Sequence, residues 1–286
     1  MDERNKVTLP DGTIMPKLGQ GTWYMGEKRA LWKQEVEAIR LGIDLGMTLI
    51  DTAEMYGEGL SEEIVGEAIR GYARTNLFLV SKVYPHNAGR KKIFESCNAS
   101  LKRLGVDYLD GYLLHWRGNI PLSETVGCMN ELVAQGKVKN WGVSNFDIED
   151  MRELWSINGG NKCAFNQVLY HLNSRGTEYD LLPWLKEHNV PMMAYCPMAH
   201  NKNMRKELTE NQLIITISQK YNITPEQLIL YFVLNQINVV PIPKAGTSKH
   251  VKENASVAAL NILEEDIKKL SSEFPAPTKK TFFDML

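Results

Sequence analysis

The sequence has few cysteines, and no two of them are close together. The four are Cys97, Cys128, Cys163 and Cys196, and no C-x-x-C motif occurs. This spacing suits neither a disulfide framework nor the common zinc sites. We therefore expect reduced thiols, a cytoplasmic location and no bound metal.

Long hydrophobic runs are also missing. No stretch of about eighteen consecutive apolar residues occurs, and the charged segment 1–6 is not followed by the apolar core of an export signal. The 33 basic and 34 acidic residues nearly cancel, which leaves a formal net charge of -1. Nucleic acids and anionic membranes attract proteins with an excess of positive charge, so neither is an expected partner.

No linker, internal repeat or low-complexity stretch divides the chain. Its 286 residues, of which 43% are hydrophobic, suffice for one large core. We expect a single domain over residues 1–286, and a monomer, because no coiled-coil pattern or large apolar stripe is evident. The segment around Pro275 and Pro277 is expected to be a short surface tail, which would leave a binding pocket fairly open.

Short apolar runs alternate with longer helical patterns from about Leu18 onward, as in βα units with a parallel sheet. Ser61 is expected to begin one helix, and Thr224 to begin another with a capping box. Gly105 and Gly136 are expected to end two more. The longest gap, before the last run, is expected to hold two helices. Strands are predicted to begin near eight positions, which are Leu18, Thr48, Leu77, Tyr108, Lys139, Ala164, Pro191 and Val239.

A third glycine is missing where a dinucleotide-binding open sheet would need it. The segment Gly19-Gln20-Gly21-Thr22-Trp23-Tyr24 carries only two glycines of the G-x-G-x-x-G motif. Eight βα units then favour the closed alternative, a (β/α)₈ TIM barrel of the α/β class. Residues 7–15 alternate in polarity around a Pro-Asp-Gly turn, which predicts an N-terminal β-hairpin that plugs the barrel.

Polar side chains stand at the carboxyl ends of nearly all the predicted strands, where barrel active sites are built. They are Asp51, Lys82, His115, Ser144, Asn145, Asn166, Gln167, Tyr195 and Lys244, with Tyr56 on the loop after Asp51. Taken singly, each has an ordinary explanation, such as a loop cap, a solvated lysine, a core histidine or a packing aromatic. Taken together, Asp51, Tyr56, Lys82 and His115 make a proton-donating group.

Tyr56 is the expected acid of this group. A free tyrosine has a pKa of about 10, and a neighbouring ammonium lowers it. We expect Lys82 to act in this way and Asp51 to hold Lys82 charged and oriented. His115 would position a substrate oxygen against the tyrosine hydroxyl. Such a group is typical of carbonyl reduction.

The stretches that carry these residues resemble the aldo-keto reductase family, from Gly19 to Asn254. The local sequence is closest to bacterial members similar to diketogluconate and methylglyoxal reductases. The resemblance implies a TIM barrel, a nicotinamide coenzyme as hydride donor, and a catalytic tetrad of Asp51, Tyr56, Lys82 and His115. The matching motifs are Leu18–Trp23, Asp51–Gly57, Ser81-Lys82, Leu113–Trp116, Trp141–Phe146, Asn166-Gln167 and Ile242–Lys244.

By the same resemblance, other positions would hold the coenzyme, with Ser144, Asn145 and Gln167 at the carboxamide and Tyr195 stacked on the nicotinamide. The whole expected coenzyme set is Gly21, Thr22, Ser144, Asn145, Gln167, Tyr195, Cys196, Lys244, His250, Glu253 and Asn254. The residues expected to shape the substrate pocket are Trp23, Tyr24, Tyr84 and Trp116.

Three positions depart from the family pattern. Cys196 replaces a serine that usually contacts the pyrophosphate. Ala245 and His250 replace the hydroxyl residue and the arginine that usually meet the 2′-phosphate. Lys244 and the start of a helix near Ser248 are left to bind that phosphate. We therefore expect NADPH as the coenzyme, with NADH as a weaker alternative.

Two other functions stay open from the sequence. A Schiff-base aldolase would use Lys82 as a covalent nucleophile, but it leaves Tyr56 and Gln167 unexplained. A nucleotide-sensing interaction subunit would need no turnover, but the chain carries the whole tetrad and no docking segment. For a reductase, the expected substrates are small activated carbonyls such as methylglyoxal, together with short aromatic aldehydes.

Overall fold

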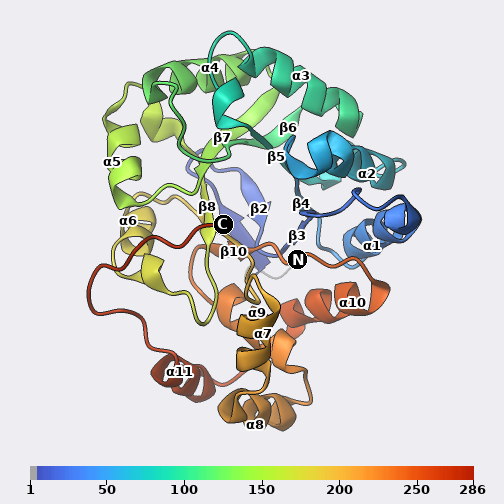
Figure 1. Cartoon of the computed structure of the whole chain (residues 1–286), viewed down its shortest axis with the longest axis vertical. Coiled ribbons are helices and arrows are strands. Elements are labelled where there is room, and N and C mark those ends of the chain that lie inside the picture. Colours follow the sequence, from blue (N-terminus) through green and yellow to red (C-terminus); the bar gives the residue numbers. More distant parts are fainter. Residues whose placement is uncertain (1–4) are drawn as a thin grey trace.

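The computed structural model describes residues 5–286 and has a central sheet surrounded by helices (Figure 1). Its eight parallel strands are β3 (Gly19–Gly21), β4 (Leu49–Asp51), β5 (Phe78–Val83), β6 (Leu109–Leu114), β7 (Val138–Ser144), β8 (Asn166–Leu169), β9 (Met192–Tyr195) and β10 (Val239–Pro241). Each pairs with the next along the chain, so the order in the sheet is the order in the sequence. Part of the charged segment considered for an export signal, residues 1–4, lies outside the described residues.

The sheet closes into a barrel between its first and last strands. Gly21 forms a parallel bridge with Lys244, and the Gly21 N–H donates to the Pro243 carbonyl oxygen at 3.1 Å. A Cβ at Gly21 would lie 2.7 Å from the Ile242 carbonyl oxygen, so only glycine allows this approach. The predicted (β/α)₈ TIM barrel is confirmed, and every strand begins within two residues of its predicted start.

The helices follow the strands in the alternating pattern that a barrel requires. They are α1 (Trp32–Asp44), α2 (Leu60–Ala68), α3 (Ile93–Leu104), α4 (Leu122–Ala134), α5 (Ile148–Ser156), α6 (Leu181–Glu187), α7 (Lys202–Thr209), α8 (Gln212–Tyr221), α9 (Pro225–Leu234), α10 (Ser248–Ser256) and α11 (Glu264–Glu273). Gly105 ends α3 in the left-handed conformation at φ 68°, and Thr224 caps α9 with a capping box, both as predicted. In the described part of the chain, no helix is long and apolar enough to cross a membrane.

One local prediction is wrong, and another is one residue out. The gap before β10 holds three helices instead of two, because the short polar α7 is held by the Asn201 cap and has almost no buried face to mark it. The helix predicted to begin at Ser61 is present, but α2 begins one residue earlier, at Leu60 after Gly59 with φ 95°, and no side chain caps it. The Ser61 hydroxyl instead lies 3.0 Å from the Thr22 carbonyl oxygen, inside the protein.

The predicted N-terminal hairpin is present and fills the bottom of the barrel. Its strands β1 (Lys6–Thr8) and β2 (Ile14–Pro16) pair antiparallel, with Val7 opposite Met15. These two side chains pack in one apolar cluster with Phe78, Phe165 and other residues from strands around the barrel. In the described part of the chain, the hairpin therefore covers the bottom of the barrel with apolar side chains.

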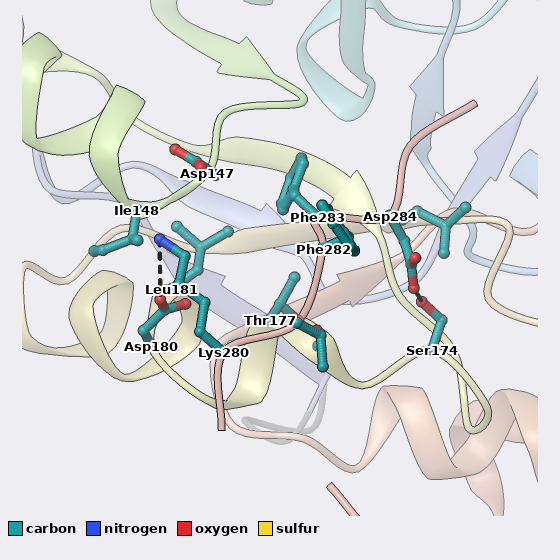
Figure 2. A pocket seen from close by; sticks show the side chains of 13 residues that line it. Asp147, Ile148, Ser174, Thr177, Asp180, Leu181, Lys280, Phe282, Phe283 and Asp284 are labelled. Atoms are coloured by element: carbon teal, nitrogen blue, oxygen red, sulfur yellow. Dashed lines mark hydrogen bonds and ion pairs between the residues drawn. The ribbon is translucent and has the colours of Figure 1, made fainter. Parts of the chain in front are cut away.

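The C-terminal tail does more than cover the surface. After α11 it turns back over the barrel, and the C-terminus lies near the middle of the view in Figure 1. The Ser174 hydroxyl donates to Asp284 at 2.5 Å, and Lys280 lies 3.9 Å from Asp180, as Figure 2 shows around the pocket beneath the tail. The Leu286 N–H donates to the Tyr195 hydroxyl at 3.3 Å, so the tail reaches the barrel mouth that we expected to be open.

Candidate active site

A cavity of about 260 Å³ opens at the carboxyl ends of the strands. Because parallel strands all point the same way, their terminal side chains meet at this one face. Most of the predicted site residues line it, namely Gly21, Thr22, Trp23, Tyr24, Asp51, Tyr56, His115, Trp116, Ser144, Asn145, Gln167, Tyr195, Cys196 and Lys244. In the described part of the chain, no group of histidine, cysteine and acidic side chains is arranged to hold a metal ion.

Lys82 lies behind the cavity wall and is completely buried. Its ammonium donates to Asp51 Oδ2 at 2.8 Å, to the Thr52 carbonyl oxygen at 2.9 Å and to the Tyr56 hydroxyl oxygen at 3.2 Å. A lysine ammonium has three donors and no acceptor, so these bonds use all of them. Tyr56 therefore accepts from Lys82, and the tyrosine's own proton is left to donate to a group in the cavity.

Burial controls the ionisation of these groups. It raises the pKa of Asp51 and lowers that of Lys82, while the attraction between the two opposite charges works against both shifts. The pKa of Tyr56 is raised well above its usual value, first by burial and then by the negative charge of Asp51. We expected a pKa lowered overall by Lys82, whereas burial and the charge of Asp51 raise it. Tyr56 holds its proton at neutral pH.

His115 directly follows the last residue of β6 and lies beside Tyr56. Its ring lies 5.6 Å from the Tyr56 ring in an edge-on arrangement. Burial, and then the Lys82 charge, lower the pKa of His115 to about 2, so the imidazole is neutral and has one N–H. Its Nδ1 has no hydrogen-bond partner although it is buried.

Amide and hydroxyl groups form the opposite wall of the cavity. Asn145, held at φ 59°, donates to the His115 carbonyl oxygen at 3.2 Å and accepts from the Tyr195 hydroxyl at 2.8 Å. Gln167 donates to Asp51 Oδ1 at 2.7 Å, and Ser144 donates to the Gln167 carbonyl oxygen at 2.9 Å. Asp51 is thus shared between the lysine side and the amide side, which fixes the two walls relative to each other.

The residues predicted for the far end of the coenzyme are more exposed. Lys244 follows β10 and His250 lies in the first turn of α10, and both are exposed. Thr247 caps α10 by accepting from the His250 backbone N–H at 3.4 Å. Glu253 lies 3.8 Å from Lys249, and Asn254 is buried. Only Lys244 among the predicted residues of this end also lines the cavity.

Three of the four predicted substrate residues line the cavity. Trp23 and Tyr24 stack with ring centroids 4.5 Å apart, and Trp116 lies 4.9 Å from the His115 ring. Tyr84 does not line the cavity, and instead packs edge-on behind Trp116 at 6.0 Å.

Apart from Cys196, no residue between β9 and α7 was among the predicted site residues. Met198, Ala199 and His200 of this segment line the cavity, as does Arg205 in α7. Arg205 donates to the carbonyl oxygens of Met198 and Ala199, both at 3.1 Å. Cys196 and Ala199 have positive φ angles of 50° and 68°, which are unusual for these residue types and often occur at functional sites. Such angles leave no clear signal in a sequence.

These residues fit a nicotinamide dinucleotide. The amide groups of Asn145 and Gln167 suit a carboxamide, and the Tyr195 ring offers a flat surface beside them. Gly21, which also lines the cavity, has no side chain to occupy it. At the other end, the Lys244 ammonium and the start of α10 suit a phosphate.

Comparison with known proteins agrees with this geometry. The model of the aldo/keto reductase family matches residues 17–273. The chain is 52% identical to methylglyoxal reductase YeaE of Escherichia coli over 99% of this chain and 100% of that protein. It is 32% identical to glyoxal reductase of Bacillus subtilis over 94% of this chain and 92% of that protein. A solved aldo/keto reductase from Klebsiella pneumoniae, in complex with NADP and acetate, superposes with a TM-score of 0.95 at 50% identity, covering 99% of both chains.

Proposed function

The chain belongs to the aldo/keto reductase family, and from that premise we propose that it uses NADPH to reduce small 2-oxoaldehydes such as methylglyoxal to alcohols. Short aromatic aldehydes are the second substrate class. NADPH-dependent carbonyl reduction follows from the family and the relatives, whereas the substrate and the residue roles below are proposals. One observation carries the roles: the saturated Lys82 ammonium leaves the Tyr56 proton free for a cavity ligand.

Bound NADPH supplies the hydride that reaches the carbonyl carbon. Tyr56 donates its hydroxyl proton to the carbonyl oxygen as negative charge develops there, so its O–H bond breaks and the product alcohol O–H forms. Lys82 then holds the Tyr56 phenolate through the bond that measures 3.2 Å in the resting protein. The neutral His115 ring orients the carbonyl oxygen through its single N–H.

Asn145, Gln167 and Tyr195 would hold the nicotinamide end of the coenzyme, and Ser144 would orient Gln167. Lys244 and the amino terminus of α10 would hold the 2′-phosphate, with Glu253 and Asn254 near the adenine. Because Ala245 offers no hydroxyl, the preference for NADPH over NADH should be modest. This proposal is supported by the exposure of Lys244 and His250 beside the start of α10.

The substrate class follows from the walls of the cavity. Trp23, beside Tyr56, and Trp116, beside His115, supply apolar surface, and the tail residue Leu286 also lines the cavity. A second carbonyl next to the first withdraws electrons and makes hydride acceptance easier, which favours 2-oxoaldehydes. The names of the relatives from Escherichia coli and Bacillus subtilis support the same class.

The test is to mix the protein with NADPH or NADH and a panel of carbonyl compounds, and to follow the loss of reduced coenzyme by absorbance. We expect the highest kcat/KM for methylglyoxal and related 2-oxoaldehydes. A higher kcat/KM for a bulky steroid ketone would overturn the proposed substrate class.

The two alternative functions receive no support. Lys82 is completely buried and all its donors are used, so it is not placed as a free nucleophile for a Schiff base. The named relatives are reductases, which speaks against a subunit that only senses nucleotides.

We also propose that the chain is a monomeric cytoplasmic protein with one domain. Its four cysteines are all free, and three of them are buried, which suits a reducing compartment.

A further inference from the structure

Two consecutive polar side chains are completely buried at the start of α2, and the proposed chemistry uses neither. They are Ser61 and Glu62, both with 0% exposure. Burying a carboxylate is costly unless it is paired and hydrogen-bonded. Glu62 meets this requirement through two different neighbours, which lie on β5 and α3.

The first neighbour is Ser81, whose hydroxyl donates to Glu62 Oε1 at 2.5 Å. Ser81 comes directly before Lys82 on β5, and successive strand residues face opposite sides. Ser81 therefore points outward to α2 while Lys82 points into the barrel. The Glu62 bond fixes the position of β5 at the residue that precedes the catalytic ammonium.

The second neighbour is Arg103 on α3, which donates from Nε to Glu62 Oε2 at 2.6 Å. The two side chains form an ion pair with Arg103 Nη2 at 2.5 Å from Glu62 Oε2. The Arg103 side chain passes so close to Gly59 that a Cβ there would lie 2.7 Å from Arg103 Cδ and Nε. Gly57, Glu58 and Gly59 have positive φ angles of 56°, 54° and 95°. This unusual loop directly follows Tyr56, so Arg103 supports the backbone that places the proposed proton donor.

Glu62 therefore contacts the supports of both Tyr56 and Lys82. Its charge also acts on the pKa of Lys82, which burial lowers and which Asp51 and then Glu62 raise. The Tyr56 hydroxyl and the Lys82 ammonium must stay within hydrogen-bond distance for the proton transfer described above. A displacement of about 1 Å can cost on the order of 10²-fold in rate.

We propose that Glu62 is a positioning residue for carbonyl reduction, one that holds the Tyr56 loop and the Lys82 strand in register through Arg103 and Ser81. This inference rests on the proposed function of Tyr56 and Lys82. It assigns to Glu62 no contact with the substrate or the coenzyme.

The main experiment compares Glu62→Gln with a matched control, Asp110→Asn. Asp110 also pairs with an arginine, Arg74, at 2.6 Å, and accepts from the Leu79 N–H at the opposite end of β5 and β6. It is less completely buried than Glu62. Each variant replaces the carboxylate that pairs with an arginine by a neutral amide, so the free energy of unfolding should fall in both. We expect roughly a 10-fold or greater fall in kcat for methylglyoxal in Glu62→Gln alone, with the Kd of NADPH within about 2-fold of wild type.

Glu62→Gln leaves Arg103 without its partner and could unfold the protein. Ser81→Ala keeps the Glu62 pair with Arg103 and removes only the bond to β5. We expect Ser81→Ala to fold and to lower kcat several-fold, again without a change in the Kd of NADPH. A double variant, Glu62→Gln with Arg103→Met, removes both charges, and should fold better than the single variant and keep the low kcat.

The inference is overturned if Ser81→Ala has the kcat of wild type, or if Asp110→Asn loses as much kcat as Glu62→Gln. Tyr56→Phe, measured alongside, separates this failure from that of the proposed function. If Tyr56→Phe remains active, the proposed function is wrong. If Tyr56→Phe is inactive and Ser81→Ala is unaffected, only the role of Glu62 is wrong.

Discussion

The two ends of the proposed coenzyme site are built in different ways. At the nicotinamide end, the Lys82 and Asp51 side chains are buried. They make four hydrogen bonds, to each other, Thr52, Tyr56 and Gln167. At the adenosine end, Lys244 and His250 are exposed. Buried polar groups have few alternative partners, whereas exposed ones can exchange protein contacts for water at little cost. Single substitutions at the nicotinamide end should therefore lower the rate of reduction strongly. Substitutions at the adenosine end should change the preference for NADPH or NADH with little loss of stability.

The most severe test of this contrast is Tyr56→Phe. We expect reduction to fall by about 10²–10⁴-fold or more, because only the hydroxyl can supply the proton. The Kd of NADPH should stay close to that of wild type, since the ring and its packing remain. Single-turnover kinetics and coenzyme fluorescence measure the two quantities. Near-normal turnover of an aldehyde would remove Tyr56 from the proposed role.

Lys82→Met tests the buried end through stability. The change leaves the Asp51 carboxylate buried without its partner, and breaking such a pair costs about 3–5 kcal/mol. The matched change at the exposed end, Lys244→Met, should alter the free energy of unfolding by less than about 0.5 kcal/mol. Denaturant titrations of both variants check this. Equal losses in the two would mean that the ends do not differ as described.

His115 predicts a pH dependence of stability. An unfolded histidine gains a proton below about pH 6.5, whereas His115 in the folded protein, with a pKa of about 2, does not. The unfolded state then binds more protons, so the folded state loses about 1.4 kcal/mol per pH unit from this group as the pH falls below about 6.5.

The measurement is the unfolding free energy between about pH 5 and pH 7 for wild type and His115→Asn. We expect the variant to lose less stability than wild type on acidification, since it lacks the titrating ring. Parallel pH curves for the two proteins would contradict a neutral buried His115.

The smallest expected effect concerns coenzyme choice at the exposed end. His250 is exposed in the first turn of α10, so its ring is placed to hydrogen-bond the 2′-phosphate. His250→Ala should raise the Kd of NADPH a few-fold and leave the Kd of NADH unchanged, which coenzyme fluorescence titrations measure. Equal Kd values for NADPH in His250→Ala and wild type would exclude His250 from the phosphate site.

The same contrast explains how much could be predicted from the sequence. Strand periodicity located β3 to β10, and the rule that strand ends converge brought Asp51, Lys82 and His115 together without any structure. The raised pKa of Tyr56 was not foreseen, because it depends on how completely the folded chain removes water from the phenol. Residue types show which groups can meet, whereas burial decides how they ionise.

Irregular backbone was the other source of error. The segment from Cys196 to Ala199 lines the cavity through two positive φ angles, and the tail residue Leu286 reaches Tyr195 after a long excursion. Neither follows a helical or strand period, so no pattern in the sequence marks it. Because no periodic pattern marks the tail, we expected it to stay at the surface and leave the pocket open.

The way the barrel closes has a consequence for how the chain folds. β3 finds its second neighbour only in the segment after β10, through the bridge between Gly21 and Lys244. The hairpin that carries Val7 likewise packs against Val240 and Ile242, from the far end of the sequence. Contacts between such distant residues are slow to form, since a long loop must be closed first. During synthesis the amino-terminal strands must therefore wait, with one edge unpaired, until β10 has left the ribosome.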